Sequence, residues 1–259
     1  MIPKIIHYCW FGGNKKPTNF AKYYNSWKEK CPDYEIIEWN ESNFDIDSCC
    51  IYVREAYNQQ KWAFVSDYAR LKILYEYGGI YLDTDVELIK NLDILLDNHL
   101  YMGMEPPNFT VNTGLGFGSE KGASFLKELL DIYENVHFIN QDGSLNLKTC
   151  GQYTNELLKK KGFIEKKEIQ IIENVIKIYP SEFFCPLNWN NNQIELTPNT
   201  YSIHHYDYSW ASNIDKEIHK HEQIINKFLG KYVGSIISYI YRKTRKFVYK
   251  VILFFHKNH

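Results

Sequence analysis

The chain has 259 residues, of which 44% are hydrophobic and 24% charged, as in a globular protein and unlike disordered or collagen-like chains. The formal net charge of -1 hides an asymmetry: from Asn226 to the end there are eight Lys and Arg and no acidic residue, while the remainder has 22 basic and 31 acidic residues. An acidic body with a basic tail is not typical of nucleic-acid-binding domains, so we expect no nucleic acid among the partners.

The N-terminal part of the chain predicts a strand, a helix and a second strand. Residues 2–10 are an apolar, β-branched run that ends near Gly12-Gly13, as in a buried strand that leads into a tight loop. Residues 18–30 are typical of a helix capped by Thr18, residues 34–39 of a strand, and residues 40–48 of a polar loop. This order indicates the opening of a parallel sheet.

A long helix and a short strand lead into an acidic pair. Residues 61–77 contain no Gly or Pro, place apolar side chains at helical spacing and stop at Gly78-Gly79, which predicts a helix that ends there. Residues 80–82 follow as a short apolar strand, and Asp83 and Asp85 come directly after it. Open α/β sheets bind ligands at the carboxyl ends of their strands, so we expect both carboxylates at a ligand-binding edge.

The later predicted elements are an apolar Gly-rich stretch, three helices and two strands. The stretch covers 111–118, the helices lie near 122–135, 152–161 and 215–229, and the strands lie near 169–178 and 200–205. The sequence has no repeat and no clear linker. We therefore expect one domain over residues 1–230, followed by a C-terminal helix over 231–259.

Two charged pairs each allow two interpretations. Asp83 and Asp85 can share a divalent cation such as Mn2+ or Mg2+, which prefers oxygen ligands, or they can form an ordinary turn. Asp67 and Arg70 lie at i and i+3 of the predicted helix, within reach of each other. They can form a surface ion pair, or Arg70 can hold a diphosphate while Asp67 accepts hydrogen bonds from sugar hydroxyls.

Four motifs in residues 2–210 resemble the family-32 glycosyltransferases, the sugar-transferring group with the D-x-D signature. They are IHYCWFGG at the N-terminus, SDYAR at 66–70, YGGIYLDTDV at 77–86 and IHHYDYSW at 203–210. The group includes yeast outer-chain mannosyltransferases and bacterial capsule enzymes, and its motifs are similar to those of the large clostridial glucosylating toxins. The resemblance implies a GT-A type α/β fold that binds a nucleotide sugar on a mainly parallel central sheet.

The resemblance also implies which residues bind the donor and the acceptor. For the donor, Trp10 would stack on the nucleotide base, Asp67 and Arg70 would hold the sugar and its phosphates, Tyr81 would pack beside the D-x-D, and Ser209 and Trp210 would close over the diphosphate. Asn112 resembles a residue that lines the acceptor side. Thr149-Cys150-Gly151-Gln152 stands where the family has Thr-Gly-Pro, and Gln in place of Pro is a departure.

The implied metal ligands come from two distant parts of the sequence. Asp85 would bind Mn2+ or Mg2+ directly, Asp83 would face the sugar and the ribose, and His204 would complete the metal shell, with His205 as the alternative. The implied donor is UDP-hexose, since Trp10 resembles the stacking residue of UDP-using relatives, and GDP-mannose is the second choice. Transfer would retain the anomeric configuration. The acceptor would be a glycan or a lipid-linked oligosaccharide, and the product would serve the synthesis of a capsule or surface glycan.

The C-terminal segment predicts a basic amphipathic helix. In residues 231–257, apolar side chains such as Ile237, Ile240 and Val251 fall in one half of the helical wheel, and the basic ones from Arg242 onward fall in the other. Charges interrupt every long apolar run, so we do not expect it to span a bilayer. We expect it to lie on an anionic membrane surface; a last helix packed on the domain, with a solvated basic face, is the alternative.

The cysteines and the N-terminus bear on location. The six cysteines form no C-x-x-C pair and no zinc-finger spacing, so we expect reduced thiols. Since the sequence begins without a charged leader, a long apolar core or a cleavage site, we expect a cytoplasmic protein, peripheral at the inner face of the membrane.

Two rival functions fit part of the sequence. Haloacid-dehalogenase-like phosphatases also place a D-x-D after an apolar strand, but on their first strand and followed by Thr or Val where this chain has Glu87. A non-catalytic nucleotide-sugar sensor or membrane partner subunit would keep the pocket without turnover, and release of nucleoside diphosphate separates it from an enzyme.

Overall fold

The computed structural model describes residues 1–188, 193–207 and, further on, 217–218, 221–222, 224–225, 234 and 237–245. The chain divides into two compact units, one of Met1–Leu187 with Ile194–Tyr206 and the other of Asn188–Gln193 with Asp207–His259. The elements that position the candidate site all belong to the first unit. The expected boundary at residue 230 falls outside the described residues and stays a prediction.

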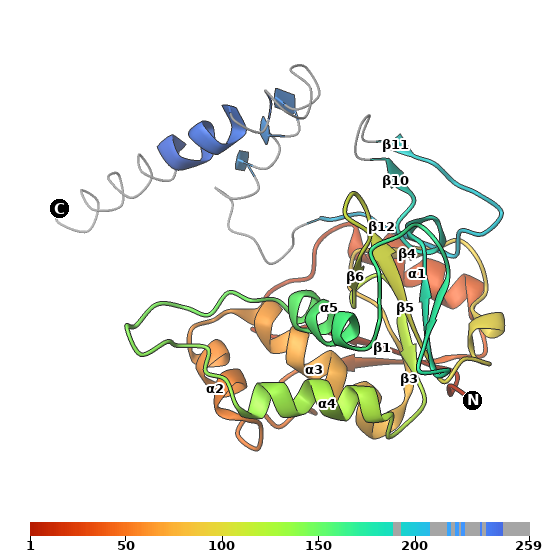
Figure 1. Cartoon of the computed structure of the whole chain (residues 1–259), viewed down its shortest axis with the longest axis horizontal. Helices are drawn as coiled ribbons and strands as arrows, with labels where there is room; N and C mark the ends of the chain where they lie inside the picture. Colours follow the sequence, from red (N-terminus) through yellow and green to blue (C-terminus); the bar gives the residue numbers. More distant parts are fainter. Residues whose placement is uncertain are drawn as a thin grey trace. The chain divides into compact units, whose positions relative to one another are not determined.

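An eight-stranded mixed sheet forms the centre of the first unit (Figure 1). In spatial order its strands are β2 (Glu35–Trp39), β1 (Ile5–Cys9), β3 (Gly79–Tyr81), β7 (Phe117–Ser119), β5 (Leu100–Glu105), β9 (Ile176–Tyr179) and β8 (Gln170–Ile172), with β6 (Thr110–Asn112) paired to β5. β1 is parallel to β2 and β3, β5 is parallel to β9, and β7 lies antiparallel between β3 and β5. Therefore β1, β2, β3, β5 and β9 run in one direction, with their carboxyl ends at one edge.

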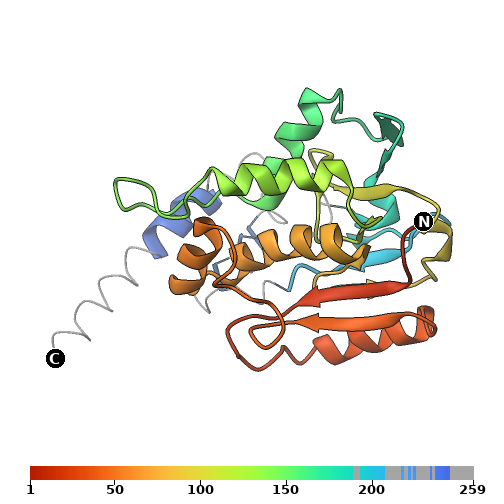
Figure 2. The same ribbon diagram turned by 90° about the horizontal axis from the view of Figure 1, so that it is seen from below.

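Helices cover both faces of this sheet. One face carries α2 (Ile51–Asn58), α3 (Trp62–Tyr77), α4 (Ser124–Glu134) and α5 (Cys150–Lys160), as Figure 1 shows. The other face carries α1 (Phe20–Lys30) and the two-stranded sheet of β4 (Val86–Leu88) and β12 (Ser202–His204). Figure 2 shows α1 and α3 on opposite sides of β1 and β2. The remaining elements are η1 (Asp93–Leu95), η2 (Ser181–Phe183), β10 (Leu187–Asn188) and β11 (Gln193–Ile194).

Side-chain alternation along the strands produces two apolar cores. In β1, Ile6 and Tyr8 join the core beside α1, whereas Cys9 joins the core beneath α3. In β5, Met102 lies in the core beneath α3 and its neighbour Tyr101 in the other. A strand buried on both faces has a continuous apolar sequence, which explains the apolar run that predicted β1.

Two predicted elements need correction. The first helix begins at Phe20 because Thr18 and Asn19 form the turn before it, and Asn19 makes no side-chain cap. The segment 169–178 forms two strands, β8 and β9, because Glu173 and Asn174 have φ of 50° and 59° and reverse the chain in a tight turn. The sequence patterns did not indicate α2, β4 or β5.

A buried histidine joins β1 to β2 and to the end of α3. Nδ1 of His7 accepts a hydrogen bond from the Trp39 indole (3.0 Å), so Nε2, 2.9 Å from Gly78 O, carries the proton and donates it. Gly79 has φ +104°, and a Cβ there would lie 2.8 Å from His7 Nε2. Burial lowers the pKa of His7 to about 4.

We predict that His7 makes the protein less stable in mild acid. The unfolded chain takes up a proton on His7 near its ordinary pKa of 6.5, whereas the folded protein does so only near pH 4. The free energy of unfolding therefore falls as the pH drops through this window, by up to about 3 kcal/mol. Urea unfolding of wild type and His7→Gln across the window measures it. Equal losses of stability in the two proteins would contradict the prediction.

Candidate functional site

The acidic pair lies in the loop between β3 and β4, at the carboxyl edge of the sheet. Asp83 N–H donates to Gly114 O (3.1 Å), and Val86 N–H donates to Asp83 O (3.1 Å), so the loop is held at both ends. β4 pairs antiparallel with β12, and the register sets His204 opposite Val86. Because Asp85 precedes Val86, this pairing brings the imidazole to the acidic pair.

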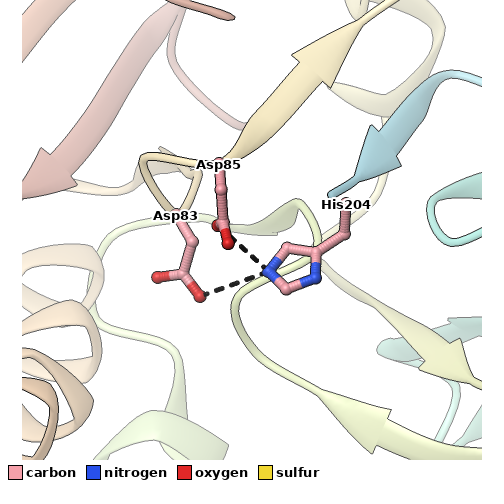
Figure 3. A group of neighbouring side chains, drawn as sticks. All are labelled: Asp83, Asp85 and His204. Atoms are coloured by element: carbon pink, nitrogen blue, oxygen red, sulfur yellow. Dashed lines mark ion pairs between the residues drawn. The ribbon is translucent and has the colours of Figure 1, made fainter. Parts of the chain in front are cut away.

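Asp83, Asp85 and His204 form a group that can hold a metal ion (Figure 3). Nε2 of His204 lies 3.2 Å from Asp85 Oδ1 and 3.9 Å from Asp83 Oδ2. Adjacent ligands of an octahedral cation, each about 2.1 Å from it, lie about 3 Å apart, so these atoms fit one ion after small movements. Two carboxylate oxygens and one imidazole nitrogen are a donor set that suits Mn2+.

The protonation of His204 is coupled to the two carboxylates. Burial alone would lower the pKa of His204, but Asp85 and Asp83 outweigh it, and the pKa lies above its ordinary value. Within the described residues, its buried Nδ1 has no hydrogen-bond partner, and Tyr206 packs edge-on with ring centroids 4.1 Å apart. Contact with the Tyr206 ring therefore helps to orient the imidazole.

The structure distinguishes the two adjacent histidines. Nε2 of His205 lies 2.8 Å from Glu87 Oε2, and its ring stacks on Tyr23 with centroids 4.7 Å apart. The backbone N–H of His205 donates to Asp85 O (2.9 Å). His204 thus brings its side chain to the acidic pair, and His205 supports the Asp85 backbone.

A buried guanidinium lies between two carboxylates beside this group. Nη2 of Arg70 is 3.1 Å from Asp67 Oδ1 and 3.2 Å from Asp83 Oδ1. The Tyr81 ring lies 4.7 Å from the guanidinium, and its hydroxyl donates to Asp83 Oδ1 (3.1 Å). Arg70 is only 6% exposed, so its contact with Asp67 is a buried pair and not a surface one. Burial opposes the charge of Arg70, but Asp83 and its neighbours outweigh it and raise the pKa, so Arg70 stays charged.

The first turn of α5 holds the other oxygen of Asp67. The Cys150 N–H donates to Asp67 Oδ2 (2.8 Å). Thr149 and Gln152 form a capping box at this end of the helix: the Thr149 hydroxyl accepts from Gln152 N–H, and the Gln152 side chain accepts from Thr149 N–H. Gln152, which departs from the motif that this segment resembles, therefore caps the helix end that holds Asp67.

Gly114 allows the Asp83 carboxylate to lie against the turn between β6 and β7. A Cβ at Gly114 would overlap Asp83 Oδ2 and come within 3.2 Å of Arg70 Nη1. Asn112 Oδ1 accepts a hydrogen bond from Gly114 N–H (2.8 Å) and so holds the turn. The sequence patterns did not single out Gly114, although the Gly-rich stretch 111–118 was the signal that contained it.

The remaining predicted donor-binding residues are Trp10, Ser209 and Trp210. Trp10 lies half-buried just beyond β1, the strand next to β3, and its indole N–H donates to Asn14 O (2.7 Å). Ser209 and Trp210 lie outside the described residues. Base stacking by Trp10 and closure by Ser209 and Trp210 stay predictions. The sequence patterns assigned no role to Glu105 or to Tyr206, which lie beside Asn112 and His204, although Tyr206 belongs to the motif at 203–210.

Residues 17–102 match a family model described as "Glycosyltransferase sugar-binding region containing DXD motif". Over 132 residues the chain is 33% identical to inositol phosphoceramide mannosyltransferase 3 of Schizosaccharomyces pombe, a match that covers 50% of this chain and 36% of that protein. The matched stretch thus spans about a third of the length of the S. pombe mannosyltransferases. Uncharacterized glycosyltransferase L373 of Acanthamoeba polyphaga mimivirus is 27% identical over 227 residues, 83% of this chain and 86% of that protein.

The fold is similar to that of a solved glycosyltransferase. PaToxG Glycosyltransferase superposes with a TM-score of 0.51 at 19% identity, over 62% of this chain and 70% of that chain. At this identity the similarity concerns the fold alone. Together with the mixed, largely parallel sheet, it confirms the GT-A type α/β fold that the sequence motifs implied.

We predict that Gly114→Ala weakens cation binding at the acidic pair. The added methyl group takes the place of Asp83 Oδ2, so the carboxylate must turn away from His204. Titration of the metal-free protein with Mn2+ should show an affinity at least about tenfold below wild type.

Gly143→Ala is the control for a methyl group that touches nothing, because no atom lies within 4 Å of a Cβ there; unlike Gly114, it has a positive φ, so it also controls for backbone strain. Equal Mn2+ affinities for Gly114→Ala and Gly143→Ala would show that the Asp83 position does not matter for the cation.

Proposed function

We propose that this chain transfers a hexose from a nucleoside diphosphate sugar to a glycan acceptor, because residues 17–102 match the model of a glycosyltransferase sugar-binding region that contains the DXD motif. The observation that carries the proposal is the convergence of Asp83, Asp85 and His204 at the carboxyl edge of the sheet. A divalent cation held there would stabilise the negative charge that develops on the departing diphosphate.

We propose that Arg70 and Tyr81 hold Asp83 ready for the donor. Both groups contact Asp83 Oδ1, which leaves Oδ2 on the side of His204. Asp67 is held in turn by Arg70 and by the N–H of Cys150. Carboxylates fixed in this way can accept hydrogen bonds from donor hydroxyls without reorganising during the reaction.

We propose that the transfer retains the configuration of the anomeric carbon. The bond from that carbon to the diphosphate breaks, and the bond to the acceptor oxygen forms on the same face of the sugar. A phosphate oxygen of the departing diphosphate takes the proton of the acceptor hydroxyl. The family resemblance supports this course, which does not use a carboxylate nucleophile of the kind found in retaining hydrolases.

The names of the relatives bear on the substrates. Several are mannosyltransferases named for inositol phosphoceramide, which is a lipid. This supports a hexose such as mannose and a lipid-borne acceptor. We therefore propose GDP-mannose and UDP-hexoses as the donors to compare, since Trp10 can stack on either base. A donor at a hundred times its dissociation constant would add about 2.7 kcal/mol to stability and can be found by thermal shift.

We predict that Asp85→Asn lowers donor turnover by at least about 100-fold while the protein stays folded. The amide keeps the shape of the side chain but lacks the charge that a divalent cation requires. Release of nucleoside diphosphate from GDP-mannose and UDP-hexoses with Mn2+ is the measurement.

Asp131→Asn, at an exposed aspartate of α4, is the matched control and should keep wild-type turnover. Full activity of Asp85→Asn would reject the metal assignment. A wild-type protein that is stabilised by a nucleotide sugar but releases no diphosphate would be a sensor and not a transferase.

We also propose that the C-terminal unit binds an anionic membrane surface. In this unit, residues 237–245 are helical, and Arg242 and Arg245 form ion pairs with Glu222 and Glu217. These pairs use basic side chains inside the unit, whereas Ile237 and Ile240 are 39% and 58% exposed. A helix with exposed isoleucines and a lysine, Lys243, that packs over the Tyr239 ring suits the headgroup region of a bilayer. In the described ranges, no helix combines the length and the apolar character needed to cross a membrane. The location of the protein at the inner face of the cytoplasmic membrane stays a prediction.

We predict that Ile237→Asp with Ile240→Asp reduces binding to liposomes that contain an anionic lipid by at least about tenfold. Burial of two isoleucine side chains among acyl chains contributes more than this factor requires. Co-sedimentation of the full chain is the measurement. Ile171→Asp changes an isoleucine of β8 that is 62% exposed and serves as the matched control. If the double variant and Ile171→Asp bound equally well, residues 237 and 240 would not face the lipid.

A further inference from the structure

Glu105 lies at the same edge of the sheet as the acidic pair. It is the last residue of β5, which runs parallel to β9 and in the direction of β1 and β3. Its carboxylate therefore emerges at the carboxyl edge, beside the turn between β6 and β7 and beside the chain that follows β12.

One carboxylate oxygen of Glu105 joins these two segments. Oε2 accepts a hydrogen bond from Asn112 Nδ2 (2.8 Å) and another from the Tyr206 hydroxyl (2.9 Å). Asn112 lies at the end of β6, and Tyr206 lies two residues beyond the end of β12. Hydrogen bonds to a charged acceptor are about twice as strong as neutral ones, so this oxygen is a firm junction.

One partner of Glu105 contacts a member of the metal-binding group, and the other contacts a residue next to the group. Asn112 Oδ1 accepts from Gly114 N–H (2.8 Å), and Gly114 packs directly against the Asp83 carboxylate. The Tyr206 ring packs edge-on against His204 with centroids 4.1 Å apart. Glu105 is thus linked to both sides of the group, through Asn112 to the Asp83 side and through Tyr206 to the His204 side.

The backbone of Tyr206 shows that this arrangement is enforced. Tyr206 has φ +53°, a left-handed conformation that a tyrosine seldom adopts. Such conformations persist where the surroundings fix them, and they cluster at functional sites. Here the hydroxyl is held by Glu105 and lies 3.2 Å from Cys185 Sγ. The side-chain contacts therefore hold the residue that packs on His204.

We propose that Glu105 is a positioning residue of the transferase site, which acts through Tyr206 on His204 and through Asn112 and Gly114 on Asp83. This inference rests on the proposed function, because it concerns how these residues meet a divalent cation. Groups behind metal ligands typically change metal affinity or activity by about 10- to 100-fold when removed.

The test compares the Mn2+ affinity of the metal-free full-length protein with its kcat. Glu105→Ala removes both hydrogen bonds and should weaken Mn2+ binding about 10- to 100-fold. Glu105→Gln keeps an oxygen that can accept both bonds and should stay within about fivefold of wild type. Glu128→Ala, at an exposed glutamate of α4 that pairs with Lys161, is the matched control and should bind Mn2+ as wild type does.

Tyr206→Phe tests the hydrogen bond from Tyr206 to Glu105 separately from the one that Asn112 donates. It keeps the ring beside His204 but removes the hydroxyl, and should weaken Mn2+ binding at least about fivefold. In a double variant with Glu105→Ala, the loss of Mn2+ affinity should be smaller than the product of the losses in the two single variants, because both changes break the same hydrogen bond. If Glu105→Ala does not fold, the Mn2+ affinities of Tyr206→Phe and Glu105→Gln are compared instead, and only Tyr206→Phe should bind more weakly.

Three results would overturn the inference. Unchanged Mn2+ affinity in Glu105→Ala or in Tyr206→Phe would show that the junction does not position the ligands. A loss of kcat in Glu105→Gln of more than about 1000-fold, at wild-type Mn2+ affinity, would make Glu105 a catalytic residue instead. Fully independent effects in the double variant would exclude action through Tyr206. If wild type itself showed no Mn2+-dependent release of nucleoside diphosphate, the proposed function would fail, which is a separate outcome.

Discussion

The candidate site depends on the balance of charge around Arg70. Asp67, Asp83 and Asp85 bring three carboxylates to one edge of the sheet, where like charges repel. The buried guanidinium contacts Asp67 and Asp83, and the imidazole of His204 lies beside Asp83 and Asp85. Breaking a buried ion pair by removal of one partner costs about 3–5 kcal/mol. The geometry of the acidic group therefore depends on α3 carrying Arg70 beneath the end of β3.

The fold meets this requirement with a sharp connection and a distant pairing. Gly78 caps the end of α3 and Gly79 begins β3 directly after it, so Arg70 and Asp83 meet although the last turns of the helix and a strand separate them. The register of β12 on β4 then brings in His204, which lies near the C-terminal end of the first unit in the sequence. Glu105 and Asn112 lie at the ends of β5 and β6 and complete the surroundings of the acidic group.

Sequence patterns predicted the parts of the site that are local. An unbroken helical repeat, two glycines and a short apolar run follow one another, so α3, β3 and the place of Asp83 could be predicted. His204 needed the family resemblance, since nothing near it in sequence points to β4. Gly114 and Glu105 were missed because their roles arise from contacts across the sheet. β5, with the sequence LYMGME, was missed because Gly and Met are not typical of strands.

The pairing of β4 with β12 also orders events during biosynthesis. The acidic pair leaves the ribosome long before His204, and a nascent chain that stops short of residue 202 contains both aspartates but neither the imidazole nor the strand that carries it. The three residues that could hold a metal ion are all present only when almost the whole first unit has been translated. An unfinished chain would therefore lack the complete donor set of the proposed cation site, which the polypeptide gains only with β12.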